Sequence, residues 1–481
     1  MKRFSCVLLA VMLLASLVAC GSQPAEDTTT DAPAWEGLEG LHVGYGDAEY
    51  TPGNGTPLAG YGNSTSRLST GHLTPLYVMC LAMTDGEDIL LLYSMDTNSM
   101  SEYWVTLARE RVSAATGIDS QKIILCATHS HCAPDLGLPT DTHPQIQEAH
   151  DKSLQAAEDA ALAALADLAP ATVSGTTVET EGLAFVRHYI LSDGSVAGDN
   201  FGDWNAGVIT DYSMENDPQL VLAKFDREGD KADILLMNFQ VHPCLESSID
   251  TTTMSADLVG RARDYVSEKT GMDVIYFTGA AGNQNAKTMI RNDAHGMNAT
   301  EYAAKLGDYA IVALHNLTAL NGDGITITHQ DYTGDVWQVT DPTVVEKAQE
   351  VKKLFTEQGR EIATPLAKEY GFASVYEANA IINHSNMEPT RTMEMNAINI
   401  GGLGLVTAPY EMFSVQGSHI KDNSPFAVTV VCTMAGPHNG YIPAKAAYEY
   451  GCYESQTAYY VSGTAEIVAD KYVEMLGQVK N

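Results

Sequence analysis

The sequence predicts an α/β protein with a mixed, largely parallel central sheet that is flanked by helices. Short runs of apolar and β-branched residues, each ended by a polar or glycine-rich turn, indicate buried strands. Ala-rich stretches with apolar residues three and four apart lie between these runs and indicate helices. In α/β folds, ligands bind beyond the carboxyl ends of the strands. We therefore expect the active site at those ends.

The strand pattern covers residues 88–94, 122–128, 233–241, 273–278, 398–408 and 426–432. The helical pattern covers residues 144–168, 258–270, 299–316 and 343–370. The first of these helices is expected to stop before Pro170, because proline cannot continue a helix. Strand signals are few between 324 and 384, so this segment is predicted to be a helical insertion.

Residues 1–19 have the pattern of a secretory signal peptide, in which Lys2 and Arg3 precede a short apolar run. The run ends in Leu-Val-Ala-Cys20, which resembles a bacterial lipobox and would make Cys20 the lipid-modified first residue. An ordinary signal peptide with an incidental cysteine is the alternative. Residues 20–40 are rich in small and polar residues and predict a disordered tether before a body at 41–481. We expect this body to be exported and lipid-anchored to the outer face of the bacterial cytoplasmic membrane, or to face the periplasm.

The composition, with 45% hydrophobic and 18% charged residues, is that of an ordinary globular protein. The formal net charge of -34 argues against nucleic acid or an anionic membrane surface as a partner, because so acidic a surface gains no counterion release there. No stretch after the signal peptide approaches the roughly 20 apolar residues of a membrane helix, so the anchor is the only expected membrane contact. The cysteines of the body form no CxxC pair, and most are expected to be buried free thiols.

Residue types that bind metals or catalyse reactions gather where the predicted strands end. Five strand ends carry, in chain order, His129 with His131, His242, the glycine-rich turn 279–285, Glu411 and Tyr441. A catalytic zinc takes about three protein ligands of the histidine and carboxylate types and leaves one position for water. The joint pattern therefore favours a metal site at these ends.

His129 and His131 are expected to face one site, because residues two apart in an extended segment point the same way. One would bind metal and the other would touch water or substrate. Taken singly, His242 has the alternative of a hydrogen-bonded core histidine, and Glu411 that of a carboxylate at a helix N-terminus.

A series of short motifs runs along the body: Thr56-Pro-Leu-Ala-Gly-Tyr-Gly62, Gly71-His-Leu-Thr-Pro-Leu-Tyr77, Thr128-His-Ser-His-Cys-Ala-Pro134, Phe185-Val-Arg-His-Tyr189, Asn238-Phe-Gln-Val-His-Pro243, Thr278-Gly-Ala-Ala-Gly-Asn-Gln-Asn285, Ala408-Pro-Tyr-Glu411, Asn439-Gly-Tyr-Ile-Pro443 and Gly451-Cys-Tyr-Glu454. In sequence and in order they resemble the neutral/alkaline (non-lysosomal) ceramidase family in its compact bacterial form. Each motif is short, but their order is specific.

The resemblance implies a hydrolase of linear amides that holds one zinc ion through His129, His242, Glu411 and Tyr441. It places His131 beside the activated water or the scissile carbonyl, where a group of near-neutral pKa can pass a proton to the leaving amine.

The resemblance also assigns residues that bind the substrate. Arg187 would hold substrate or developing charge, and Tyr453 would donate a hydrogen bond to the oxyanion. The glycine-rich turn would contact the substrate through Gly282, Asn283 and Asn285.

The chain departs from the family pattern in the glycine-rich turn, where Asn283-Gln-Asn285-Ala286 replaces Asp-x-Ser-Pro, and at Thr74, where aspartate is usual. The immunoglobulin-like C-terminal domain of the long ceramidases is expected to be absent. Without the serine of the turn, the substrate stays open between a ceramide-like sphingolipid and a smaller N-acyl conjugate.

We therefore predict a zinc-dependent amidohydrolase that cleaves an N-acyl substrate by metal-activated water. A non-catalytic surface lipoprotein that binds a ligand in the same pocket is the alternative. A metal-dependent esterase or phosphoesterase is a third interpretation, although phosphoesterases usually hold two metals with several aspartates.

Overall fold

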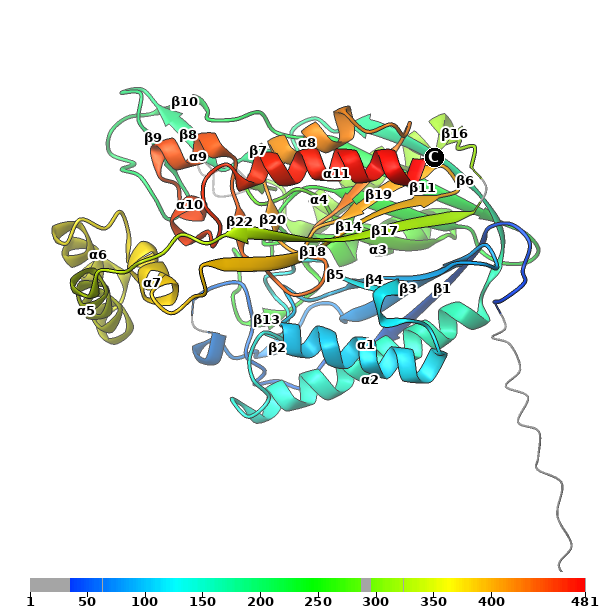
Figure 1. Ribbon diagram of the computed structural model, residues 1–481, viewed down its shortest axis with the longest axis horizontal. Helices are drawn as coiled ribbons and strands as arrows, with labels where there is room; N and C mark the ends of the chain where they lie inside the picture. The colour runs from blue at the N-terminus through cyan, green and yellow to red at the C-terminus, as the bar shows by residue number, and fades with distance from the viewer. Residues whose placement is uncertain (1–34, 63, 287–295, 323, 481) are drawn as a thin grey trace, which may run out of the picture. The chain divides into compact units, whose positions relative to one another are not determined.

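The computed structural model describes residues 35–480 apart from 63, 287–295 and 323 (Figure 1). The predicted signal peptide, Cys20 and most of the predicted tether lie outside the described residues. Trp35 to Asn481 cluster as one compact unit, and Trp35 packs against its core although it falls within the predicted tether.

The main sheet has nine strands in the order β14-β12-β11-β6-β1-β3-β4-β5, with β16 paired beside β6. In chain order these strands are β1 His42–Glu49, β3 Tyr77–Thr84, β4 Ile89–Met95, β5 Ile123–Ala127, β6 Ala169–Glu179, β11 Gln219–Arg227, β12 Ile234–Phe239, β14 Asp273–Thr278 and β16 Thr318–Ala319.

A second sheet has four strands in the order β17-β18-β19-β21. These are β17 Ile325–Asp335, β18 Thr390–Ile400, β19 Leu403–Thr407 and β21 Thr429–Cys432. Smaller pairs and a three-stranded sheet, β10-β8-β9, are made by β2 Gly71–His72, β7 Phe185–Val186, β8 His188–Leu191, β9 Val196–Gly198, β10 Ile209–Tyr212, β13 Thr253–Met254, β15 Gln284–Asn285, β20 Glu411–Met412 and β22 Tyr441–Ile442.

The two large sheets pack face to face, and helices cover their outer faces. Side chains alternate across a strand: Met79 and Leu81 of β3 lie in the core between the sheets, whereas Val78 and Cys80 lie in the core under α1 and α2. Helices α3 and α4 cover the rest of that face, and α8 and α11 cover the second sheet (Figure 1). These helices are α1 Glu102–Thr116, α2 Pro144–Ala166, α3 Asp257–Thr270, α4 Ala299–Ala313, α8 Ser414–Asp422 and α11 Thr464–Lys480.

The predicted α/β class and mixed sheet are confirmed, but the expectation of largely parallel strands is wrong. In the two large sheets only β4 with β5, β12 with β14, and β19 with β21 run parallel. Each of these pairs is joined by one helix, α1, α3 or α8, as a parallel crossover requires. The other strands follow one another through hairpins or long returns and pair antiparallel.

Glycines divide two segments that the sequence predicted as continuous. Residues 398–408, expected to be one strand, are the end of β18 and the whole of β19, joined by Gly401 and Gly402, whose φ values are 55° and 91°. Residues 343–370, expected to be one helix, are α5 (Pro342–Gln358) and α6 (Arg360–Glu369), separated by Gly359 with φ 87°. Only glycine adopts such left-handed backbone without strain.

The segment 324–384, predicted to be a helical insertion, contains strand β17 as well as helices. Its helices α5, α6 and α7 (Val375–His384) share a small core of their own, and they lie together at one end of Figure 1. Strand β17 was not predicted because polar residues occupy its exposed positions, so no continuous apolar run marks the strand. The short helices α9 (Lys445–Tyr450) and α10 (Tyr453–Thr457) complete the fold.

Among the described residues, no helix is both long and apolar enough to cross a membrane. The six cysteines of the described chain are free and buried, as predicted for most of them.

Candidate active site

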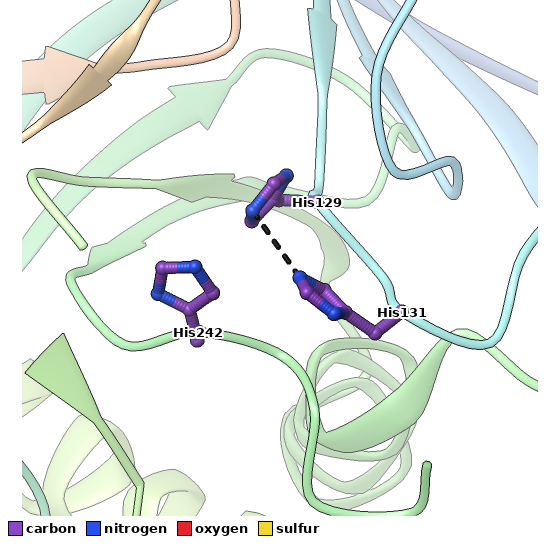
Figure 2. Close-up of side chains that lie close together, drawn as sticks. All are labelled: His129, His131 and His242. Atoms are coloured by element: carbon purple, nitrogen blue, oxygen red, sulfur yellow. Dashed lines mark hydrogen bonds between the residues drawn. The ribbon is translucent and has the colours of Figure 1, made fainter. Parts of the chain in front are cut away.

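Three histidines meet at the carboxyl ends of two strands of the main sheet, and Figure 2 shows their rings turned toward one another. His129 and His131 follow β5, and His242 follows β12. Nε2 of His131 lies 3.3 Å from Nε2 of His129, and the ring centroids of His129 and His242 are 4.9 Å apart. One ring nitrogen from each histidine lies within 4.8 Å of the other two, so the cluster could hold a metal ion.

The chain reaches this arrangement through a left-handed residue. His129 has a φ of 67°, a region that residues other than glycine seldom adopt. The turn is held against the chain after β4, because the N–H groups of Thr128 and Ser130 donate to the carbonyls of Met95 and Thr97. The rings of His129 and His131 do face one another, but the extended segment expected from the sequence is wrong. Strain at such a residue costs about 1–3 kcal/mol and is typical of functional sites.

Backbone carbonyl groups fix the ring orientation of two of the histidines. Nδ1 of His129 lies 2.8 Å from the carbonyl oxygen of Asn98, and Nδ1 of His242 lies 2.6 Å from that of Ala281. A carbonyl can only accept, so each Nδ1 carries a proton, and each Nε2 is the ring nitrogen that faces Glu411 and would bind a metal. Histidines that bind metals are held in this way. His129 and His242 therefore fit a metal.

Glu411, the first residue of β20, lies against both of these rings. Its Oε2 is 3.1 Å from Nε2 of His242 and 3.3 Å from Nε2 of His129. Burial acts to raise the pKa of Glu411, but the charge of His129 and the close contacts of His129, His242 and His438 with the carboxylate outweigh it and hold the pKa well below its usual value. An ionised carboxylate with two histidines is a donor set that suits a divalent metal.

Arg187 lies behind this centre in a buried network of hydrogen bonds. Its guanidinium donates to Oε1 of Glu454 at 2.7 Å, to the carbonyl of Gly282 at 2.9 Å and to the hydroxyl of Tyr441 at 3.1 Å. His188 lies 2.9 Å from the other carboxylate oxygen of Glu454. Burial acts to raise the pKa of Glu454, but His188 and Arg187 outweigh it and lower the pKa to about 2. Glu454 therefore fixes the direction of the guanidinium.

Tyr441 lies beside Glu411, since these two residues are register partners in the β20–β22 pair. Its hydroxyl is the one that Arg187 reaches. Burial and the charge of Glu411 raise the pKa of Tyr441 well above its usual value, so the hydroxyl keeps its proton in the absence of a metal.

A cavity of about 720 Å³ opens beside the histidines. Its wall includes the predicted residues His131, Arg187, His242, Tyr441, Tyr453 and Asn285. It also includes Gly60 and Tyr61 of the Thr56–Gly62 motif. Further wall residues, which the sequence did not single out, come from the loop after β9 (Asp199, Asn200, Trp204) and the helical insertion (Arg360, Tyr376). A cavity of this size next to polar catalytic groups can take a small molecule or part of a lipid.

No protein-family model matches the sequence, and a search of curated proteins finds no match. Solved structures do match. A crystal structure of neutral ceramidase from Pseudomonas aeruginosa has a TM-score of 0.64 and 14% sequence identity, covering 91% of this chain and 74% of that one. A ceramidase complexed with C2 has the same TM-score and identity, covering 92% of this chain and 75% of that one. The chain has the neutral ceramidase fold. The resemblance drawn from the motifs is thus confirmed for the fold.

Within this ceramidase fold, the residues of the glycine-rich turn divide by position. Asn285 lines the cavity, whereas Gly282 and Asn283 do not appear in its wall. Asn283 exchanges hydrogen bonds with Ser414, and the N–H of Arg187 donates to its carbonyl at 2.9 Å. An added Cβ at Gly282 would lie 2.8 Å from the carbonyl oxygen of Glu411. These contacts make Gly282 and Asn283 supports for Arg187 and Glu411, and their contact with substrate stays a prediction.

Tyr453 lies in the cavity wall between two other tyrosines. Its ring centroid is 5.9 Å from that of Tyr441 and 5.2 Å from that of Tyr376. Its part as an oxyanion donor stays a prediction.

Sequence reasoning missed His438 and Glu454 as parts of the site. His438 lies 3.5 Å from Oε1 of Glu411. Glu454 is the last residue of the Gly451–Glu454 motif, and His438 directly precedes the Asn439–Pro443 motif, so the motifs were a signal for them. Arg360 and Tyr376 had no such signal, because they come from the helical insertion.

A second cluster within ligand distance, His188 with Cys452 and Glu454, is buried nearby. Glu454 is already paired with Arg187 and His188. We therefore assign this cluster to the support of Arg187 and not to a metal.

Proposed function

We propose that this protein is a zinc-dependent hydrolase that cleaves the amide bond of an N-acyl substrate. The observation that carries the proposal is the convergence of His129, His242 and Glu411, with Nδ1 of each histidine bonded to a backbone carbonyl, beside a large cavity that His242 lines. The ceramidase fold supports amide hydrolysis as the reaction.

His129, His242 and Glu411 would hold one zinc ion, with the hydroxyl of Tyr441 as a further ligand. A bound zinc ion supplies Lewis-acid chemistry, which activates water at neutral pH. Tyr441 would hold the ion through its phenol oxygen, which Arg187 keeps in place by a hydrogen bond of 3.1 Å.

His131 has different surroundings from the other two histidines, and we assign it to proton transfer. Among the described residues, its Nδ1 has no hydrogen-bond partner, although the atom is buried. Its ring is free of the carbonyl contact that fixes His129 and His242. Burial and the neighbouring His129 and His242 lower the pKa of His131 well below its usual value, so the near-neutral pKa expected from the sequence is not found. The resting ring is neutral and would accept a proton and pass it to the leaving amine. It lines the cavity, where the scissile bond would lie.

Arg187 and Tyr453 would stabilise charge on the carbonyl oxygen of the substrate. Both line the cavity, and both carry hydrogen-bond donors whose positions are fixed before the substrate arrives. The proton-bearing hydroxyl of Tyr453 suits this part, because burial, its largest influence, raises its pKa well above the usual value.

The substrate we propose is a ceramide-like sphingolipid or a smaller N-acyl conjugate. The enzyme would act outside the cell, held at the membrane only by lipid on Cys20. Its acidic surface gives no affinity for nucleic acid or anionic lipid.

A panel of N-acyl substrates tests the proposal, with sphingoid and amino-acid amines and with and without chelator. We expect amine release that chelator abolishes and zinc restores, together with about one zinc per chain. A His419→Ala variant is the matched control, since His419 lies on the surface beside Asp470. Amide hydrolysis that persists in a zinc-free preparation would contradict the proposal.

A non-catalytic ligand-binding lipoprotein remains the second candidate. It predicts tight binding of N-acyl compounds with no amine release, even when the zinc site is filled. The same panel distinguishes the two functions.

A further inference from the structure

Two residues with side-chain acceptors line the cavity, and the motifs give a part, contact with the substrate, to only one of them. They are Asp199, in the loop after β9, and Asn285, which carries the predicted substrate contact and whose side-chain oxygen is buried. The amide nitrogen of Asn285 donates to Oδ2 of Asp199 at 3.1 Å, so the two side chains form one unit. We call it the acceptor pair.

The acceptor pair lies directly beside the metal centre. The backbone of Asn285 is paired on one side with that of His242 and on the other with that of Phe185, two residues before Arg187. A group bound to the pair would therefore belong to the part of the substrate that adjoins the amide bond.

Both acceptors have capacity for a ligand. Asn285 is only 2% exposed, and its Oδ1 is buried with no partner in the described part of the chain. A buried acceptor without a donor destabilises the free protein, and a bound donor would remove this cost. Within the same described residues, no lysine, arginine or histidine forms an ion pair with Asp199.

The loop that carries Asp199 is fixed by the helical insertion. Asn200, the next residue, has a φ of 66° and accepts hydrogen bonds from Arg360 at 2.8 Å and from the Tyr376 hydroxyl at 3.4 Å. The guanidinium of Arg360 also lies over the ring of Tyr376, 5.5 Å from its centroid. Arg360 is thus engaged in holding this loop and, among the described residues, forms no ion pair with Asp199. The charge of Asp199 acts on Arg187, whose pKa it helps to raise.

We propose that Asp199 and Asn285 determine specificity by binding a hydrogen-bond donor, a hydroxyl or an ammonium, on the amine half of the substrate. This inference rests on the proposed amide hydrolysis. A plain acyl chain offers no donor, so the group must come from the amine half. An amine half that carries a carboxylate would meet the charge of Asp199 and be rejected. A plain alkylamine would leave both acceptors unsatisfied.

The test uses amides with one short acyl chain and four amine halves: an aminodiol, a diamine with a free ammonium, a plain alkylamine and an amino acid. We expect kcat/KM for the aminodiol or the diamine to exceed that for the alkylamine by about 10- to 100-fold, the range of a charge-assisted hydrogen bond. Asp199→Asn should reduce this ratio at least about tenfold. Asp203→Asn is the matched control, because Asp203 lies exposed in the same loop and bonds to Asn205. The aminodiol and diamine arms show which donor the pair prefers.

Equal kcat/KM for the four substrates, or an Asp199→Asn variant that lowers all of them by the same factor, would overturn the inference. Calorimetric binding of the free amine halves separates this inference from the proposed function, because it needs no turnover. Binding of the aminodiol or diamine that Asp199→Asn abolishes would support the acceptor pair even if no substrate were hydrolysed. Absence of such binding, with hydrolysis intact, would refute the pair and leave the hydrolase standing.

Discussion

The buried pair of Glu454 and Arg187 permits a prediction about stability. The side chain of Glu454 is 0% exposed and that of Arg187 is 7% exposed. The carboxylate of Glu454 also contacts the ring of His188. Glu454→Gln keeps the volume and removes the charge, so the guanidinium of Arg187 stays buried without its counterion. Breaking a buried ion pair in this way costs about 3–5 kcal/mol.

The pKa of Glu454 gives a similar magnitude. It falls from 4.5 to about 2, which corresponds to about 3 kcal/mol of stability from ionised Glu454. Because the folded pKa is lowered, this contribution is complete above pH 4.5 and is lost as the pH falls toward 2. The loss of stability caused by Glu454→Gln should therefore reach its full value at pH 7 and be much smaller at pH 3.

Denaturant unfolding at both pH values measures the effect. The midpoint denaturant concentrations are compared under conditions where the two proteins have the same dependence of unfolding free energy on denaturant. Glu148→Gln is the control, because its ion pair with Lys152 is 40% and 46% exposed and should contribute about 1 kcal/mol or less. A Glu454→Gln variant that loses less than about 1 kcal/mol at pH 7, or that loses as much at pH 3, would refute the reasoning.

Three further outcomes are expected at the metal centre. His129→Ala or His242→Ala should lose bound metal, measured by elemental analysis, while circular dichroism shows the fold intact; retained metal would overturn the ligand assignment. Tyr453→Phe should lower kcat by about 10- to 1000-fold at unchanged metal content, and metal loss would contradict its place at the oxyanion. Gly282→Ala should weaken metal binding and destabilise the protein by about 1–3 kcal/mol, because its Cβ would lie 2.8 Å from the carbonyl oxygen of Glu411. Gly477→Ala, whose Cβ meets no atom within 4 Å, should show neither effect.

Local pattern in the sequence identified the parts of the fold that are buried on both faces. The apolar run predicted at 273–278 is β14 residue for residue, and its partner β12 was found to within two residues. Both lie between covered faces, so most of their positions are apolar and the signal is nearly continuous. Strand β17 was missed because its solvent-facing residues are polar.

Sequence also marked the side chains to which we assign the chemistry, because His129, His131, His242 and Glu411 follow strands that pattern alone could find. That these four side chains lie close together follows from the order of the strands in the sheets, which sequence pattern does not give. The antiparallel connections arrange the three parallel strand pairs so that the carboxyl ends of their strands lie close together. The left-handed backbone of His129 then turns its ring toward the other histidines.

Only the tertiary structure showed the acceptor pair and the helices that hold it. Asp199, Asn285 and Arg360 come from a loop, a turn and an insertion that are far apart in the chain. Each is an ordinary polar residue in its own segment, and no local spacing relates them. Sequence fixes the chemistry of a side chain and the propensity of its segment, whereas contacts between distant segments arise from the packing of whole sheets and helices, which no local pattern records.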